Sequence, residues 1–131
     1  MDLENASKLI ILDTNMLTFP AQFGVNIYDQ IEERFGKTFK LCTLSGSLRE
    51  LKGIAEQKPS NKKIVALTKQ IIKKKGIKII NSDKYVDNEL IAWGKKGAII
   101  ATNDKELKEK LIKKGIKVIF IKQKKIIGMI E

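Results

Sequence analysis

Residues 9–15 read Leu-Ile-Ile-Leu-Asp-Thr-Asn, four apolar side chains followed directly by a carboxylate and two more polar residues. A short apolar run bounded by polar residues is typical of a buried strand. In open α/β sheets, ligands bind outside the carboxyl ends of the strands, which is where Asp13 falls. Because an unpaired carboxylate is costly to bury, we expect Asp13 to face water, a cationic side chain or a metal ion.

Strand-like and helix-like segments alternate along the rest of the chain. Apolar runs predict strands at 9–12, 39–44, 77–80, 98–102 and 117–121, with residues 122–131 as one more edge strand. Apolar residues at helical spacing predict helices over 25–35 and 64–74, a further helix with Ser45 as its N-cap, and helices that begin at Asp87 and at Asn103 or Asp104. Residues 16–25 read as a loop or the entry to a helix, and Pro59–Asn61 as a break. This order predicts one α/β domain, residues 1–131, in three layers around a mainly parallel, twisted sheet of four to five strands.

Composition narrows the class of protein. A hydrophobic fraction of 43% excludes a disordered chain, and no apolar run reaches the roughly 18 residues of a membrane helix. Residues 1–5 are acidic and lack the pattern of a secretory signal. The single cysteine, Cys42, cannot form an internal disulfide. We therefore expect a cytoplasmic protein with no membrane partner.

Charge indicates the kind of partner. The chain has 26 basic and 15 acidic residues and a net charge of +11. A strongly basic protein of this kind is typical of one that binds nucleic acid. Lysine enrichment in a thermophile is the competing explanation, but it does not account for the excess of lysine over glutamate.

Four acidic residues fall at or near the junctions where predicted strands pass into helices: Asp13, Glu50, Asp87 and Asp104. Parallel strands bring their carboxyl ends to one edge, so we expect these side chains to converge. Clustered carboxylates repel one another unless a cation is present, and Mg²⁺ and Mn²⁺ prefer oxygen ligands. Such ions can activate water and stabilise the leaving oxygen in phosphodiester hydrolysis.

The absence of histidine removes competing chemistries. With no histidine and one cysteine, a Ser-His triad and histidine or four-cysteine zinc sites are excluded.

Each acid also has a purely structural alternative. Asp13, Asp87 and Asp104 are good residues for turns or helix N-termini, and Glu50 is placed to pair with Arg49 or Lys52 on a solvated face.

The acids and their neighbours resemble the PIN-domain nucleases. The resemblance rests on residues 12–15, Glu50-Leu51, Asp87 ahead of Leu90-Ile91, and residues 101–105, in the family's order over nearly the whole chain. The stretch 19–25, Phe-Pro-Ala-Gln-Phe-Gly-Val, is similar to archaeal and eukaryotic PIN proteins that process small-subunit rRNA. VapC toxins share the acids but usually lack this stretch, so the likeness to them is more distant.

This resemblance implies a metal-dependent endoribonuclease that uses Mg²⁺ or Mn²⁺ and acts on single-stranded RNA or an rRNA precursor in ribosome biogenesis. Carried over by position, the metal ligands and catalytic residues are Asp13, Glu50, Asp87 and Asp104, and the supporting polar residues are Asn15 and Thr102. Lys105 adjoins Asp104 and is a candidate for contact with the RNA backbone. Related sequences often have two adjacent acids where this chain has Asp87-Asn88, which makes Glu89 the alternative ligand.

Two other functions stay open at this point. The chain could be the toxin of a toxin–antitoxin pair, or a non-catalytic RNA-binding factor in ribosome assembly with assembly factors as partners. A homodimer is a further alternative, since Phe19, Phe23 and Tyr28 could line either the core or a dimer surface; the core is favoured.

Overall fold

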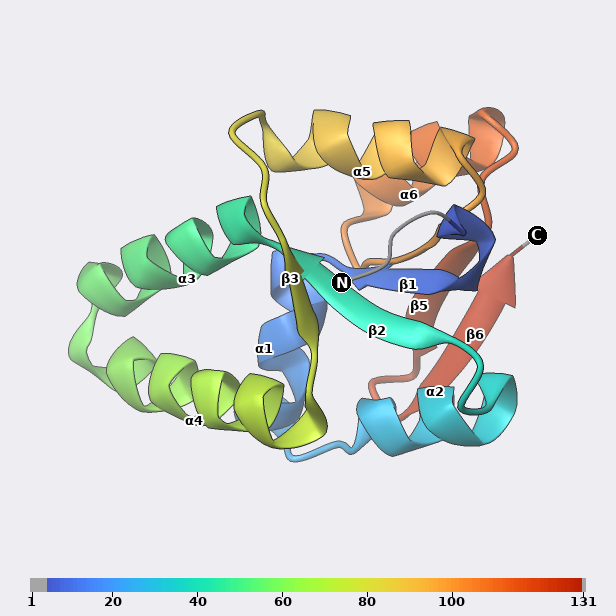
Figure 1. Ribbon diagram of the computed structural model, residues 1–131. Coiled ribbons are helices and arrows are strands. Elements are labelled where there is room, and N and C mark those ends of the chain that lie inside the picture. Colours follow the sequence, from blue (N-terminus) through green and yellow to red (C-terminus); the bar gives the residue numbers. More distant parts are fainter. Residues whose placement is uncertain (1–4, 131) are drawn as a thin grey trace.

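The computed structural model of the chain describes residues 5–130. The strands are β1 (Leu9–Leu12), β2 (Lys40–Leu44), β3 (Lys78–Ile80), β4 (Ile99–Ala101), β5 (Val118–Lys122) and β6 (Ile126–Ile130). The helices are α1 (Thr14–Phe23), α2 (Ile27–Phe35), α3 (Ser45–Gln57), α4 (Pro59–Lys75), α5 (Val86–Lys95) and α6 (Lys105–Lys113), preceded by a 3-10 turn, η1 (Ala6–Lys8). Figure 1 shows how these elements are arranged.

One sheet runs through the molecule in the order β3-β2-β1-β4-β5-β6. The first five strands are parallel, and β6 is antiparallel to β5. Helices cover both faces, which confirms the predicted three-layer α/β fold with a mainly parallel sheet. The sheet has six strands, one more than the expected four to five, because the tail of the chain does form the further edge strand named above and pairs with β5. Its last residue, Glu131, lies outside the described range.

Side chains of β1 alternate between two hydrophobic layers. Ile10 and Leu12 pack into one core with α1, α2 and α4, whereas Leu9 and Ile11 pack into the other with α5 and α6. All four side chains are at most 1% exposed, and burying an aliphatic side chain of this size contributes about 1.5–3 kcal/mol. The apolar run therefore forms the doubly buried central strand that its composition predicts.

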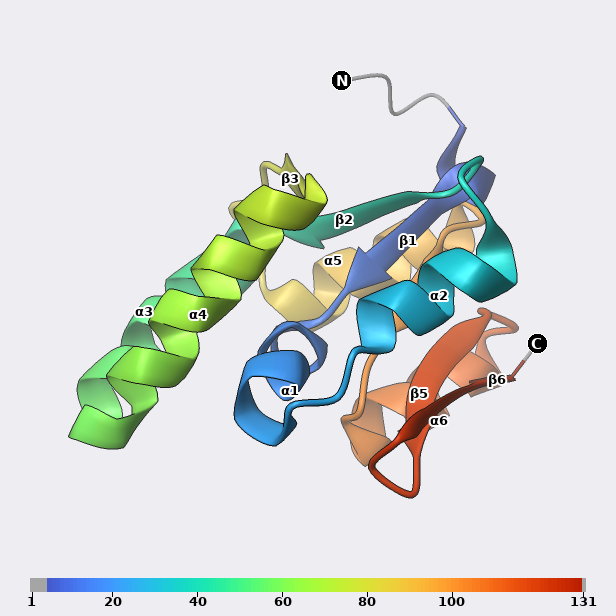
Figure 2. The ribbon, with the colours of Figure 1, turned by 90° about the horizontal axis from the view of Figure 1, so that it is seen from below.

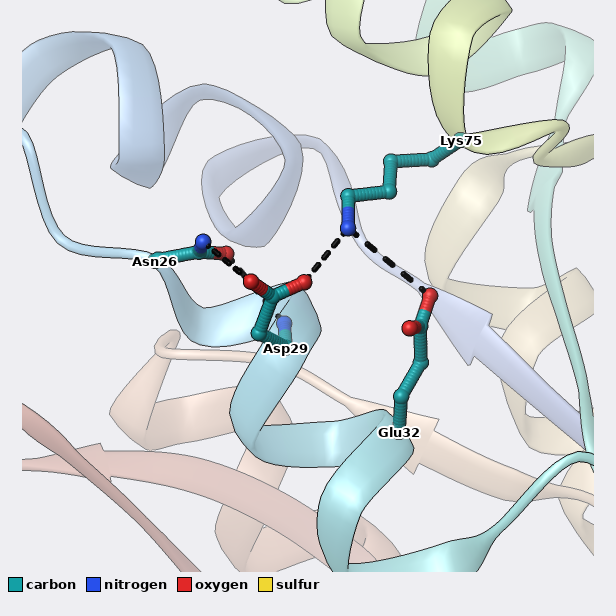
Figure 3. Close-up of polar contacts among 4 residues, drawn as sticks. All are labelled: Asn26, Asp29, Glu32 and Lys75. Carbon is teal, nitrogen blue, oxygen red and sulfur yellow. Dashed lines mark hydrogen bonds and ion pairs between the residues drawn. The ribbon is translucent and has the colours of Figure 1, made fainter.

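Helices lie on both sides of the sheet, and two of them extend beyond it. In Figure 1, α5 and α6 lie above the sheet, and α1 and α2 lie below it. Helices α3 and α4 lie side by side as a hairpin, and Figure 2 shows that hairpin projecting beyond the sheet. Ion pairs link the C-terminal end of α4 to α2. The Lys75 ammonium lies 2.5 Å from the Asp29 carboxylate and 4.0 Å from the Glu32 carboxylate (Figure 3).

The segment after the first strand is a helix, α1, rather than a loop. Pro20 lies inside it and removes one backbone donor. A proline at this position is why the sequence pattern resembles that of a loop. Burial outweighs that loss, because Met16 and Leu17 are fully buried beneath the sheet. Phe19 and Tyr28 are core residues as predicted, and the Tyr28 hydroxyl donates to the Leu17 carbonyl at 3.0 Å. Phe23 is not, because its side chain is 48% exposed.

Two predicted helix boundaries were wrong. The break around Pro59 is a single residue, Lys58, and α4 begins at Pro59 rather than at 64, since proline fits the first position of a helix. Ser45 is the first residue of α3 and does not cap it. Its hydroxyl instead bonds the backbone of Ser82, on the loop between β3 and α5.

Between residues 5 and 130, no helix combines the length and the apolar character needed to cross a bilayer. The sequence-based statement about a secretory signal falls mainly on residues 1–4, which are outside the described range.

Candidate active site

The neighbouring strands β1 and β4 mark the point in the sheet at which the chain connections change direction. The chain leaves β1 toward β2 on one side, and β4 leads to β5 on the other. At such a switch point the loops diverge and open a crevice at the carboxyl edge, which is where α/β sheets bind ligands. Asp13 directly follows β1, and Asp104 lies three residues beyond the end of β4. Both acids therefore stand at the mouth of the crevice.

A cavity of about 470 Å³ occupies this position. All four predicted acids line it: Asp13, Glu50, Asp87 and Asp104, together with Asn15. Glu89, the alternative to Asp87, is not among the residues that line it. Four separate segments thus bring carboxylates to one cavity, as expected for acids at or near the strand-to-helix junctions.

Thr102 links the two acids at the junction. Its hydroxyl donates to Asp13 Oδ2 at 2.8 Å and accepts from the backbone N–H of Asp104 at 3.1 Å. The other oxygen of Asp13 accepts from the Thr14 N–H at 2.8 Å, and Asp104 Oδ1 accepts from the Leu107 N–H at 3.1 Å. Asp13 and Asp104 are therefore helix N-caps, and the capping bonds fix their orientation toward the cavity.

The two remaining acids are held by longer-range contacts. The Thr14 hydroxyl donates to Glu50, which joins the start of α1 to α3. The loop that leads to Asp87 is fixed by Ser82, whose carbonyl accepts from the Ser45 hydroxyl at 3.0 Å and from the Arg49 guanidinium at 2.6 Å. Helix α3 thereby sets both Glu50 and the entry to α5.

Asn15 supports the same edge through the backbone. Its side-chain oxygen accepts from the Asn103 N–H at 3.1 Å, and the Asn103 side chain in turn accepts from the Ile121 N–H at 3.0 Å. This chain of bonds connects α1 to the β4–α6 loop and to β5. The polar residues predicted to surround the acids thus act in positioning them.

The environment of Asp13 disfavours its charged form. Burial raises the pKa of the Asp13 carboxyl to about 6, while hydrogen bonds from Thr102 and Thr14 lower it and the charges of Asp87 and Glu50 raise it. Within residues 5–130, no cationic side chain contributes to this balance. A buried carboxylate with acidic neighbours is stabilised by a bound cation.

Asp87 is affected in the same direction. Its partial burial, and then repulsion from Asp104, raise the pKa of the Asp87 carboxyl, although the nearby Lys110 ammonium opposes the shift. Two acids of the cavity are therefore less acidic than an ordinary aspartate, and both shifts reflect the cost of holding negative charge there.

The set of donors fits a hard divalent cation. Within the described residues, no three acidic side chains lie close enough together to form a ready-made metal group. The carboxylate oxygens that line the cavity and the absence of histidine from the sequence fit such a cation.

One residue predicted from the sequence lies outside the cavity, and two residues at the site have no clear signal in the sequence. Lys105 is exposed at the start of α6 but does not line the cavity. Lys110, on the same helix, lines an adjoining hollow with Glu50 and Asp87. Thr14 and Lys110 reach the acids only because helices from distant parts of the chain meet here, and no local pattern marks them.

A family model described as a PIN like domain matches residues 10–124. The chain belongs to the PIN-like domain family. This match confirms the resemblance to PIN-domain nucleases, and it covers all four acids.

Two relatives and one solved structure extend the comparison. Ribonuclease VapC4 of Methanocaldococcus jannaschii is 32% identical over 128 residues, with 92% of this chain and 98% of that protein covered. Ribonuclease VapC9 of Archaeoglobus fulgidus is 31% identical over 122 residues, with 92% and 88% covered. The PIN domain endonuclease Utp24 has the same fold, with a TM-score of 0.73 over 95% of this chain and 92% of that one, at 19% identity.

Thr102→Val is expected to lower the free energy of unfolding by about 1–3 kcal/mol. The change leaves the buried Asp13 carboxyl with one donor fewer and the Asp104 N–H without its acceptor, and an unsatisfied buried polar group costs about that much. Urea unfolding measures it. Thr68→Val is the matched control, because the Thr68 hydroxyl is equally buried and bonds only the Ile64 carbonyl of its own helix. Equal losses for the two variants would contradict a special role for Thr102.

Proposed function

We propose that this protein is a metal-dependent endoribonuclease that hydrolyses phosphodiester bonds in RNA. The observation that carries the proposal is the convergence of Asp13, Glu50, Asp87 and Asp104 on one cavity at the β1–β4 switch point. These four residues would hold Mg²⁺ or Mn²⁺. When bound, such an ion supplies charge stabilisation for the phosphodiester and lowers the pKa of water.

The chain's own residues perform the remaining tasks. Asp13 brings a buried negative charge to the cavity, and Thr102 keeps its carboxyl aligned with Asp104. Thr14 orients Glu50 by donating to its carboxylate. Lys105 and Lys110, on the helix that begins after Asp104, are placed to contact the RNA backbone without reading its sequence.

RNA as the substrate has two supports outside the cavity. Both curated relatives are named as ribonucleases. The net charge of +11 favours a polyanion in general. We propose a single-stranded RNA or an rRNA precursor as the partner, and the cytoplasm as the location of the protein.

Two biological roles have separate support. The resemblance of residues 19–25 to rRNA-processing PIN proteins favours a role in ribosome biogenesis with assembly factors as partners. The VapC names of the two relatives favour a toxin ribonuclease. Induced expression in a heterologous host separates them: a toxin arrests growth and cuts a mature RNA, whereas a processing enzyme leaves growth unaffected and cuts only precursor rRNA.

The cleavage test uses a 5′-labelled single-stranded RNA, with the same sequence as DNA for comparison. With Mn²⁺ or Mg²⁺ we expect internal cuts in the RNA, and with EDTA we expect none. Cleavage that persists in EDTA would contradict the metal site. No cleavage of any RNA under all metal conditions would favour the non-catalytic RNA-binding alternative.

A further inference from the structure

Tyr85 is the most exposed large hydrophobic side chain in the described part of the protein. Its side chain is 82% exposed, whereas the others of this kind range from 39% to 55%. Tyr85 occupies the N-cap position of α5, but its side chain makes no capping hydrogen bond to that helix. The fold does not use this ring, although leaving an aromatic ring in water is unfavourable.

The ring stands beside the four-acid cavity. A hollow of about 350 Å³ is lined by Tyr85, Asn88 and Lys110, and it shares Glu50 and Asp87 with the cavity. On its other side, Tyr85 lines a second hollow of about 470 Å³, again with Asn88. An aromatic surface, an amide and a cation are thus grouped beside two of the four acids.

This position is fixed rather than carried on a free loop. The segment before Tyr85 is anchored at Ser82, which is bonded to Ser45 and to Arg49 of α3. Glu50 is the residue after Arg49. Helix α3 therefore carries both Glu50 and the two residues that anchor the segment before Tyr85.

We propose that Tyr85 is a stacking platform for an unpaired nucleobase of the RNA strand next to the phosphate that is cut. Lys110 contacts a backbone phosphate of the same strand, and Asn88 faces the edge of the stacked base. Stacking on aromatic side chains is the usual way in which proteins hold single-stranded nucleic acid, and it tolerates any base. This inference rests on the proposed ribonuclease function and adds to it a residue that holds the unpaired strand.

A paired helix does not fit this arrangement. In duplex RNA each base face is covered by its neighbours, so no face is free to lie on Tyr85. A single strand presents bases and phosphates in alternation, which suits a ring followed by Lys110 and the acid cavity. The site therefore selects for an unpaired segment and not for a sequence.

The test compares Tyr85→Ala with Tyr85→Trp and with Phe23→Ala, on RNAs that carry one abasic nucleotide at successive positions. Phe23 is the matched control, because it is another partly exposed aromatic residue, at the far end of α1 from the acids. We expect Tyr85→Ala to raise KM about tenfold with kcat within about twofold, since base stacking contributes to binding on that scale. Tyr85→Trp should restore KM, and Phe23→Ala should leave it unchanged.

The abasic substrates locate the contact. One abasic position should weaken wild-type binding to the level of Tyr85→Ala and have no further effect on that variant. If every abasic RNA affects the two proteins equally, or if Tyr85→Ala and Phe23→Ala behave alike, the stacking assignment is overturned. Fluorescence anisotropy of labelled RNA without metal gives the same comparison for binding alone. A wild-type protein that never cleaves would overturn the ribonuclease proposal, while the anisotropy data would still decide the stacking proposal.

Discussion

Asp13→Asn is expected to reduce RNA cleavage about a thousand-fold and, at the same time, to make the metal-free protein more stable. The loss follows because the amide cannot supply the negative charge that holds a divalent ion, and such an ion provides several kcal/mol of transition-state stabilisation. The gain follows because the Asp13 carboxylate is 6% exposed and, within the described residues, no cation offsets its charge.

The stability gain has a definite size and pH dependence. The asparagine side chain of this variant would still accept from the Thr14 N–H and would donate to the Thr102 hydroxyl, so the main change is the removal of a buried charge. We expect the free energy of unfolding to rise by about 3 kcal/mol at pH 7 and to be nearly unchanged at about pH 4, where Asp13 is already protonated. Cleavage kinetics and urea unfolding at the two pH values measure both effects.

Asp29→Asn is the matched control. Asp29 is an exposed aspartate on α2 that pairs with Lys75 and also contacts Asn26 (Figure 3). The bond from Lys75 lowers the pKa of Asp29. The folded protein therefore favours the charged form of Asp29, whereas it disfavours the charged form of Asp13. The control variant should cleave RNA like the wild type. If Asp13→Asn cleaves equally well, or if it is less stable than the wild type at pH 7, the assignment of Asp13 as a metal ligand is wrong.

The second prediction is that the metal-free protein loses stability as the pH rises from about 4 to 7. Burial raises the pKa of Asp13 from 3.8 to about 6, so in this interval the folded state holds a proton that the unfolded state has released. Stability is therefore complete below about pH 4, falls as the pH rises through about 6, and stays low above it. At about 1.36 kcal/mol per pKa unit the loss approaches 3 kcal/mol.

Divalent metal should reverse this loss. Mn²⁺ binds the ionised carboxylates of the folded state, so at a concentration of about 100 times its Kd it adds about 2.7 kcal/mol. The effect should be large at about pH 7 and small at about pH 4.5, where protons compete with the ion. Thermal unfolding with Mn²⁺ or with EDTA across this range measures it. The readout is clear because the chain has no histidine to titrate in the same interval.

Two results would contradict this picture. If the metal-free protein becomes more stable as the pH rises toward 7, the Asp13 carboxyl is not destabilised in the folded state. If Mn²⁺ raises the melting temperature of Asp13→Asn as much as that of the wild type, the ion binds elsewhere on the protein.

Much of the architecture follows from local patterns. The apolar run of β1 and the later apolar segments predict parallel strands separated by helices, and the strand order places β1 at the centre as a doubly buried strand. Local sequence does not predict α1 as a complete helix because Pro20 interrupts its signal, and the helix forms because packing beneath the sheet outweighs one missing backbone bond. The role of Ser45 as a helix cap was a wrong prediction because its actual bonds, to Ser82, span 37 residues.

The candidate site also combines features that local sequence predicts with features that only the folded chain reveals. Local sequence places Asp13, Asp87 and Asp104 at the carboxyl edge of the sheet, because each follows a parallel strand or opens the next helix. Glu50 lies in the second turn of α3 and meets them through the packing of that helix and the bond from Thr14. How they are held, and what stands beside them, emerges only in the folded chain. Thr102 between Asp13 and Asp104, and Tyr85 and Lys110 at the adjoining hollow, depend on contacts between elements distant in the chain. Such contacts depend on how distant elements pack together, and no periodicity or motif in the local sequence indicates them.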